Sequence, residues 1–186
     1  MIMKQGLRIL AINDSPFRKG AKSSLLIGVV GRKDAVEGVM SFKVSIDGTD
    51  STESILRSIT SSRFRDQIRI VSLNGNTVAG TNVVDICEIS SRLSVPVLAI
   101  TRKKPHPADF KKAIRKATPA QYRSKAALLD RVSKSAKISR MSGFYVQHVG
   151  IGKKDAASFL ETSIKLLRLA HLIASGVSRG ESHGRI

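Results

Sequence analysis

The sequence predicts an α/β protein in which one mixed β-sheet is flanked by helices. Its first part carries three strand-like segments whose connections are too short to hold helices, which is typical of an antiparallel meander. From residue 68 onward strand patterns alternate with helix patterns, which favours parallel neighbours joined by right-handed crossovers. A length of 186 residues fits a single domain over 1–186, and 41% apolar but only 4% aromatic residues predict an aliphatic core.

The meander is expected at 7–12, 25–31 and 38–46. The first segment is continuously apolar and ends at a turn signal around 13–16, so we read it as a buried strand. The third alternates apolar and polar residues, which indicates a half-exposed strand. A turn at 47–52 then leads into a helix, in which Ser51 or Thr52 serves as the N-cap.

The second part of the chain is expected to continue the sheet and to add several helices. In chain order we expect a strand at 68–73, a helix at 83–93, a strand at 95–101, two basic helices within 105–140, a short edge strand at 144–149, and helices at 155–160 and 164–174 with Gly176 as C-cap. The strands of the meander and those at 68–73 and 95–101 make five.

The charge balance is strongly basic. Lys and Arg total 32 against 14 Asp and Glu, a formal net charge of +18. Such a domain repels itself unless a polyanion is near, which predicts phosphate-backbone binding by nucleic acid. The alternative is solubility in a salty or hot cytoplasm. Between Arg102 and Lys154 the only acids are Asp109 and Asp130, and a basic patch beside an acidic cluster favours a nuclease over a histone-like coat.

Cysteine content and hydropathy indicate the compartment. The single Cys87 cannot form an internal disulfide, which favours a reducing compartment. The first ten residues have neither a sustained apolar stretch nor a small-residue cleavage site, and no run approaches eighteen apolar residues. We therefore expect a cytoplasmic location and no membrane partner.

Polar residues gather at the expected strand ends, where open α/β sheets place their sites. The candidate ligands are Asn13, Asp14, Asp47, Asp50 and Asn74, with Asp85 in the helix that follows. Converging acids could hold Mg²⁺ or Mn²⁺, and two such ions could clamp a phosphodiester. The alternative is that these residues only form turns and cap helices.

Two further features concern phosphate and zinc. Arg102, Lys103 and Lys104 directly follow a strand, so they are either a solvated charge run or contacts to a scissile phosphate. None of the histidines has zinc-ligand spacing, and His171, on an aliphatic helix, is interpreted as structural.

Several segments together resemble a known family. In order they are Asn13-Asp14-Ser15-Pro16-Phe17, the stretch 47–52, Asn74-Gly75, the stretch 80–85, Arg102-Lys103-Lys104-Pro105, and 168–176 followed by Arg179-Gly180-Glu181-Ser182. The set resembles the archaeal endonuclease dU family, also known as domain of unknown function 99. That family is similar in turn to endonuclease V, a ribonuclease-H-like repair enzyme. The resemblance implies a ribonuclease-H-like mixed five-stranded sheet flanked by helices, and Mg²⁺-dependent cleavage of DNA at deoxyuridine or deoxyinosine.

The resemblance also implies roles for individual residues. Asp14, Asp47 and Asp50 would hold Mg²⁺ or Mn²⁺, with Asn13 and Asn74 as weaker ligands and Asp85 as a ligand or a support. Arg102 and Lys103 would hold or polarise the scissile phosphate. The loop Gly80, Thr81 and Asn82 would line a pocket for an extruded base, and Lys104 and Arg179 would contact nucleic acid.

The sequence departs from the family pattern where charge matters. The strand-four Asp of the metal site is matched by Asn74, and the strand-one Asp by Asn13 with Asp14 adjacent. An amide oxygen can ligate a metal but carries no charge, so affinity for a divalent cation is weaker. The alternative is thus a catalytically degenerate nucleic-acid-binding module on a nuclease fold. A third reading is a subunit of an RNA or DNA complex, consistent with the few aromatic side chains available for stacking.

Overall fold

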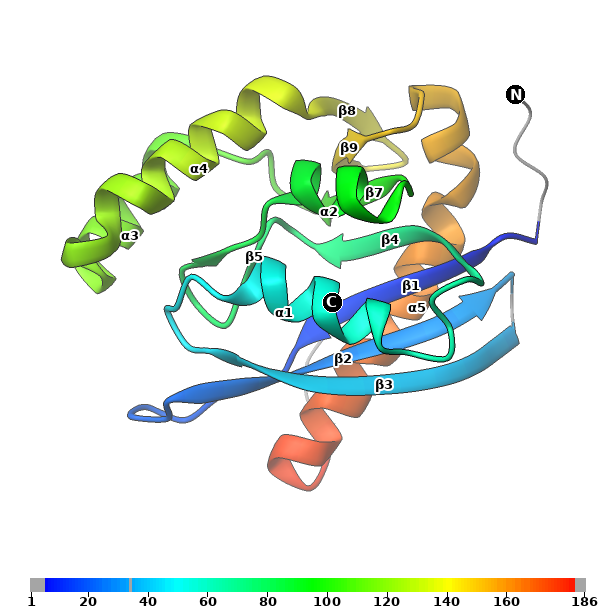
Figure 1. Cartoon of the computed structure of the whole chain (residues 1–186), viewed down its shortest axis with the longest axis horizontal. Coiled ribbons are helices and arrows are strands. Elements are labelled where there is room, and N and C mark those ends of the chain that lie inside the picture. Colours follow the sequence, from blue (N-terminus) through cyan, green and yellow to red (C-terminus); the bar gives the residue numbers. More distant parts are fainter. Residues whose placement is uncertain (1–5, 34, 183–186) are drawn as a thin grey trace.

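A mixed sheet forms the centre of the computed structural model, which describes residues 6–33 and 35–182. Within those residues the sheet has seven strands in the order β3-β2-β1-β4-β7-β9-β8, and β5 (Thr77–Val78) pairs with β6 (Asn82–Val83) in a separate hairpin (Figure 1). The five strands expected from the sequence are the consecutive set from β3 to β7, so the mixed α/β class is confirmed.

The meander consists of β1 (Arg8–Asp14), β2 (Ser23–Arg32) and β3 (Ala35–Ser45). Both pairs, β1 with β2 and β2 with β3, are antiparallel, as the short connections predict. β1 and most of β2 are buried, while β3 alternates between exposed and partly buried positions at the edge of the sheet.

The parallel part of the sheet fixes where functional side chains gather. β4 (Ile68–Asn74) runs parallel to β1, and β7 (Val97–Thr101) runs parallel to β4. The connecting helices are α1 (Ser51–Thr60) and α2 (Ile86–Leu93), which lie on the same face of the sheet (Figure 1). The C-terminal ends of β1, β4 and β7 therefore meet at one edge, which is the usual place for a site in such sheets.

Two strands correct the expected layout. β9 (Phe144–Val149) is not an edge strand, because β8 (Lys137–Met141) pairs with it on the far side from β7. Residues 137–140 were expected in a basic helix. Ser142 and Gly143 both have positive φ, 44° and 83°, and this tight turn folds β8 back onto β9 as a hairpin.

The helices also differ in extent from the prediction. The two basic helices are α3 (Pro107–Ala117) and α4 (Tyr122–Ser135), joined by the 3-10 turn η1 (Pro119–Gln121). The two expected C-terminal helices are one, α5 (Lys153–Arg179), and its C-cap is Gly180 with φ 88° rather than Gly176. Burial of its aliphatic stripe against the sheet outweighs the small cost of an interior glycine.

Two aliphatic clusters hold the layers together. One lies between the sheet and α1, α2 and α4, and contains Leu10, Val71 and Ile86. The other lies between the opposite face of the sheet and α5, and contains Ile70 and Leu167. Because successive side chains in a strand point to opposite faces, neighbours such as Ile70 and Val71 serve different layers. In Figure 1, α5 runs behind the sheet while α1 and α2 lie in front of it.

Candidate active site

Asn13, Asp14 and Asn74 come together at the ends of two parallel strands. Asn13 and Asp14 end β1, and Asn74 ends the neighbouring β4. Asn74 Nδ2 lies 3.4 Å from Asn13 Oδ1, which also accepts the backbone N–H of Asp14 at 3.0 Å. The Nδ2 of Asn13 is buried and has no partner among the described residues. The expectation that these three residues share one place agrees with the structure, while their roles as ligands stay predictions.

The carboxyl group of Asp14 has an altered acidity. Burial raises its pKa above the ordinary 3.8, opposed by the backbone N–H of Ala79, which donates to Oδ2 at 2.8 Å, and by the nearby charge of His171. His171 belongs to α5, on the other side of the sheet edge. A carboxyl group with a raised pKa, within electrostatic reach of an imidazole, is a combination suited to proton transfer.

His171 is the residue of this cluster that sequence reasoning assigned only a structural role. It shares one face of α5 with Ile164 and Leu167, and all three line a cavity of about 320 Å³ that also reaches Asn74, Arg102 and Lys103. We name this cavity the α5 pocket. One feature of the sequence could have identified it: His171 follows Ile164 and Leu167 at helical spacing, so it lies on the same aliphatic face of the helix. Arg102 and Lys103 are exposed at the end of β7, as phosphate contacts need to be.

A second cavity lies on the opposite side of the same strand ends. This α3 pocket has a volume of about 440 Å³ and shares Asn74, Thr101 and Lys103 with the α5 pocket. Lys104 lines it as well. Its other walls include Asn76, Phe110, Leu129 and Gln147. The two pockets thus flank the strand-end edge, with Asn74 and Lys103 between them.

Asp47 is engaged with the loop after β5 rather than with Asp14. Its Oδ1 accepts from the backbone N–H of Thr81 at 2.7 Å and from the Thr81 hydroxyl at 2.9 Å. Gly80 approaches so closely that a Cβ there would lie 2.4 Å from the same oxygen, and its φ of 86° also requires glycine. The Asp47 carbonyl accepts from the buried ammonium of Lys125 at 2.6 Å.

Asp50 and Asn82 form a separate network that runs from the surface at Ser45 to the buried Asn82. Asp50 accepts from the backbone N–H and the hydroxyl of Ser45, and from Asn82 Nδ2 at 2.7 Å. Although burial opposes it, these bonds hold the pKa of Asp50 below 3.8. Asn82 is fully buried and also binds the backbone of Ser45 and Ser51. Thr81 and Asn82 are thus interior residues, and neither the α3 nor the α5 pocket is lined by them.

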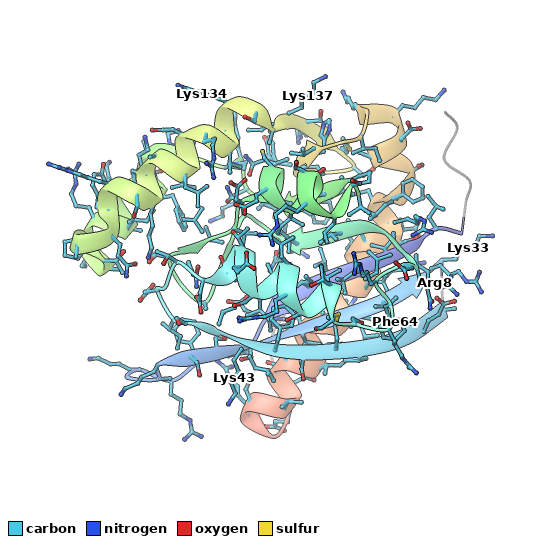
Figure 2. All side chains as sticks on the ribbon, viewed as in Figure 1. Arg8, Lys33, Lys43, Phe64, Lys134 and Lys137 are labelled. Carbon is cyan, nitrogen blue, oxygen red and sulfur yellow. The ribbon has the colours of Figure 1, made fainter. Side chains whose placement is uncertain are left out.

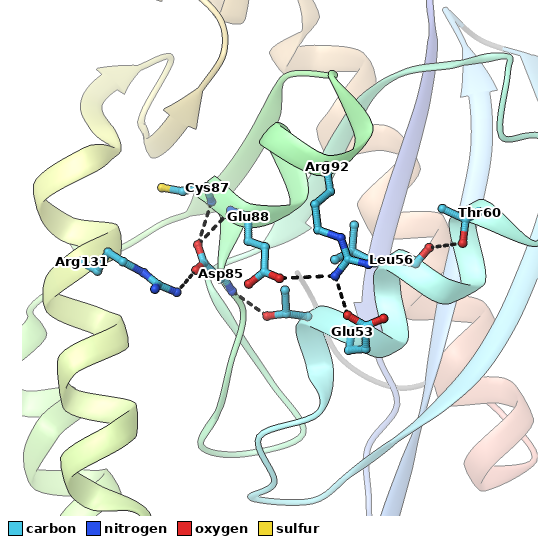
Figure 3. A network of polar contacts seen from close by, with 9 residues as sticks. Glu53, Leu56, Thr60, Asp85, Cys87, Glu88, Arg92 and Arg131 are labelled. Carbon is cyan, nitrogen blue, oxygen red and sulfur yellow. Dashed lines mark hydrogen bonds and ion pairs between the residues drawn. The ribbon is translucent and has the colours of Figure 1, made fainter.

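Asp85 serves as the N-cap of α2. Its carboxylate accepts the backbone N–H groups of Cys87 and Glu88, both at 3.0 Å, and forms an ion pair with Arg131 of α4 (Figure 3). The Asp85 side chain is only 3% exposed. In the same view Arg92 of α2 bridges to Glu53 of α1 at 2.6 Å, so polar contacts join α1, α2 and α4 at this face.

The metal prediction is tested by the donors that the structure brings together. Among residues 6–33 and 35–182 no three His, Cys, Asp or Glu side chains are placed to hold a cation. The strand-end donors are one carboxylate, two amides and one imidazole. They do not fit a two-ion site, in which several carboxylates share the cations, and they supply at most the ligands for one weakly held ion.

Arg179 is exposed at the last turn of α5, two helical turns beyond His171. None of the helices in the described part of the chain is both long and apolar enough to cross a membrane. The candidate active site is therefore the strand-end edge. It comprises the α3 and α5 pockets and a basic rim formed by Arg102, Lys103 and Lys104.

The chain is similar to a group of archaeal proteins over almost its whole length. The family model for endonuclease dU matches residues 5–178. A UPF0215 protein of Methanothermobacter thermautotrophicus is 36% identical over 190 residues, covering 98% of this chain and 93% of the relative. UPF0215 protein PF2042 of Pyrococcus furiosus is 33% identical, covering 97% and 96%.

Solved structures agree in fold. The crystal structure of an Archaeoglobus fulgidus protein of unknown function superposes with a TM-score of 0.82 at 29% identity, covering 96% of this chain and 99% of that one. Ciona intestinalis endonuclease V, in complex with a DNA that contains an inosine, has a TM-score of 0.52 at 7% identity, covering 84% and 77%. The second likeness confirms the expected ribonuclease-H-like fold, and the sequence matches show that the chain belongs to the endonuclease dU family.

Proposed function

We propose that this protein is an endonuclease that binds nucleic acid and cuts a phosphodiester at the strand-end edge, with DNA containing deaminated bases as substrate. Family membership and the endonuclease V-like fold support a nuclease-like, nucleic-acid-binding role. The observation that carries the proposal is that Asn74, Lys103 and His171 line one pocket at the strand-end edge, where β1 ends at Asp14.

The side chains at this edge suit the hydrolysis of a phosphodiester. Water attacks phosphorus, and the bond from phosphorus to the leaving sugar oxygen breaks. The proton of the attacking water passes to a base at the site, and the leaving oxygen takes up a proton to become a hydroxyl. Asp14 and His171 are the groups that can orient that water and accept its proton. Arg102 and Lys103 stabilise the negative charge that develops on the phosphate oxygens.

A divalent cation would add Lewis-acid chemistry to this site. Asp14 would hold it through its carboxylate and Asn74 through its amide oxygen. With a single carboxylate in the set, we expect weak affinity and activity that depends strongly on the concentration of Mg²⁺ or Mn²⁺.

The α3 pocket is the proposed place for a base that leaves the duplex. It has a volume of about 440 Å³, apolar walls that include Phe110 and Leu129, and polar lining residues such as Asn76 and Gln147. It adjoins Lys103, so a nucleotide whose phosphate lies at the edge can place its base there. This replaces the pocket expected at Gly80, Thr81 and Asn82, because the last two of these are buried in the interior.

The test is cleavage of labelled duplexes that carry a single uracil or hypoxanthine, in Mg²⁺, in Mn²⁺ or in EDTA. We expect a cut near the deaminated base in either metal and none in EDTA. Asp14→Asn and His171→Ala should abolish it, whereas Arg57→Gln, on the exposed surface of α1, should not. Equal cutting of undamaged duplex would contradict the substrate, and cutting in EDTA would contradict the role of the metal.

One observation favours a second function, a nucleic-acid-binding module that does not cut. Asn13 and Asn74 stand where the family resemblance expects carboxylates, and they leave Asp14 as the single acid of the strand-end set. On this reading the wild type binds the same duplexes and is inert in every metal.

We also propose a cytoplasmic location, on the ground that the lone thiol of Cys87 suits a reducing compartment.

A further inference from the structure

Gln147 presents a buried amide to the α3 pocket. It lies in β9, paired with Ala99 of β7 and Ile138 of β8, and is 3% exposed. Its neighbour Val146 belongs to the cluster under α5, so the alternation along the strand directs Gln147 to the opposite face, toward α4. Leu129 and Ser133 of α4 line the α3 pocket together with Gln147.

The carboxamide of Gln147 faces the α3 pocket and has no hydrogen-bond partner among the described residues. Its buried neighbour His148 has both ring nitrogens engaged, with the Ser139 hydroxyl at 3.1 Å and the Ile151 carbonyl at 3.0 Å. Thr101, across the sheet, donates to the carbonyl of Lys103 at 2.8 Å. No hydrogen bond joins the Gln147 side chain to any other group in the described part of the chain. The amide atoms of Gln147 are not among the buried polar atoms left without a partner, so they are open to the α3 pocket and available to a ligand that binds there.

The surroundings indicate the chemistry of that ligand. Phe110 and Leu129 give the cavity apolar walls, which suit the faces of a planar ring. A carboxamide offers one donor and one acceptor side by side, which complements a ring edge where N–H stands next to C=O. Lys103 and Lys104 line the same cavity, and their positive charge favours a ring that presents carbonyl oxygens over one that presents an amino group.

We propose that Gln147 is a specificity-determining residue that pairs with the N–H and C=O edge of an extruded base such as uracil or hypoxanthine. This inference rests on the proposed function, which brings a base to the α3 pocket. It assigns base selection to β9, a strand remote in sequence from the loop 80–82 and from the strand-end residues 13, 14 and 74.

The test measures binding, not cleavage, so that it does not depend on catalysis. Duplexes with one uracil, one N3-methyluracil or one abasic analogue are titrated by fluorescence anisotropy in EDTA. Wild type should bind the uracil duplex about tenfold more tightly than the other two, because N3-methylation removes the N–H and the abasic analogue removes the whole edge. Gln147→Met should bind all three alike, at the wild-type affinity for the abasic duplex.

The controls separate base reading from structure. Gln67→Met makes the same chemical change at an exposed position before β4 and should keep the tenfold preference. Gln147→Glu keeps the shape but replaces the donor, so the preference should fall. Unchanged preference in Gln147→Met, or equal loss of affinity for all three duplexes, would overturn the role of Gln147. A wild type without preference would overturn base extrusion itself, whereas preference without cleavage would overturn only the nuclease.

Discussion

Asp14 combines burial, charge and chemistry at a single residue. Folding places its carboxyl at the end of β1, where burial raises its pKa and the N–H of Ala79 and the charge of His171 only partly compensate. A group held in an environment that disfavours its charged form costs stability, and such residues are typical of functional sites.

The variant Asp14→Asn tests this trade between stability and function. Because the folded pKa lies above 3.8, the folded chain binds more protons than the unfolded chain between these two values, and stability falls as pH rises through that window. The asparagine variant should therefore be more stable than wild type near neutral pH, with the difference vanishing below pH 3.8. Cleavage should fall about a hundredfold or more. Thermal unfolding across pH measures the first effect, and a variant no more stable at neutral pH would contradict it.

Asn13 and Asn74 give a second prediction at the same scale. The double change Asn13→Asp with Asn74→Asp places two carboxylates side by side at the end of the strand that also carries Asp14, because the two amides already lie 3.4 Å apart. Two charges about 4 Å apart interact by roughly 4 kcal/mol at an effective dielectric of 20, and a quarter of that is about a tenfold gain in cation affinity.

The thermal midpoint of this double variant should drop without metal, because clustered carboxylates repel, and recover in Mn²⁺. Calorimetry with Mn²⁺ measures the affinity directly. The enzyme proposal expects wild type to cut already, whereas the binding-module alternative expects activity only in the variant, if in either protein. Unchanged metal affinity together with unchanged metal-free stability would show that the two side chains do not face a common cation.

Sequence reasoning reached some of these residues and not others, for physical reasons. Turn residues directly after apolar strands locate Asn13, Asp14 and Asn74, since parallel strands end at one edge. The positions of His171 and Gln147 depend instead on tertiary structure. His171 is placed by the way α5 packs across the sheet, and Gln147 by the pairing of β9 with β7 and β8. The local hydrophobic pattern of the sequence encodes neither of these.

At the scale of elements, three of the candidate acids make structural contacts: Asp85 caps a helix, and Asp47 and Asp50 hold loops in place. Asp85 holds the first turn of α2 and ties it to Arg131 of α4. Asp47 and Asp50 fix the loops between β3, β6 and α4 through Thr81, Asn82 and Lys125. Burial lowers the pKa of the Lys125 amine, opposed by the charge of Asp47, so this lysine acts as a cross-link between α4 and the 47–50 turn.

The cap on α2 yields a prediction that separates structure from metal binding. Asp85→Ala removes the acceptor for two backbone N–H groups and should lower the free energy of unfolding by about 1–2 kcal/mol. Asp85→Asn keeps a capping side chain and loses only the pair with Arg131, whose side chain is 62% exposed, so its cost should be well under half as large. Urea unfolding measures both. A change in Mn²⁺ affinity in the asparagine variant at unchanged stability would restore Asp85 as a ligand candidate.

The sequence predicts that a helix or strand exists better than it predicts where that element begins and ends. The pattern at 83–93 predicts a helix, but α2 begins three residues later because Asn82 and Val83 pair in β6 and Asp85 caps the helix. The apolar stripe of α5 continues through Gly176, so the sheet it covers decides its length. Long-range pairing and packing set these boundaries, and local propensity does not.

At the scale of the whole molecule, charge is distributed unevenly over the fold. Strands from both halves of the chain belong to one continuous sheet, in which β1–β3 form one side and β8 and β9 the other, and this supports the proposal that 1–186 is a single domain. The net charge of +18 is concentrated in the part from β7 to the start of α5, on the side of the molecule that carries α3 and α4. Figure 2 shows Lys134 and Lys137 extending away from the ribbon where α4 meets β8. The basic rim thus continues from the strand-end edge along the helices beside the α3 pocket.

This distribution predicts binding that is steeply salt-dependent and localised. If about six phosphates are engaged, affinity for duplex DNA should fall roughly thousandfold between about 50 and 200 mM salt, because each neutralised phosphate releases condensed counterions.

Lys112→Gln with Lys116→Gln, one turn apart on exposed positions of α3, should reduce the slope of log affinity against log salt by about 2 if both contact phosphate. The matched control, Lys22→Gln with Lys43→Gln, removes the same charge from exposed positions in the loop between β1 and β2 and in β3, and should leave the slope unchanged. Equal effects of the two pairs would mean that net charge alone drives binding, without a docking face. Affinity that barely changes with salt would contradict nucleic-acid binding through the phosphate backbone and leave the basic surface to a role in solubility.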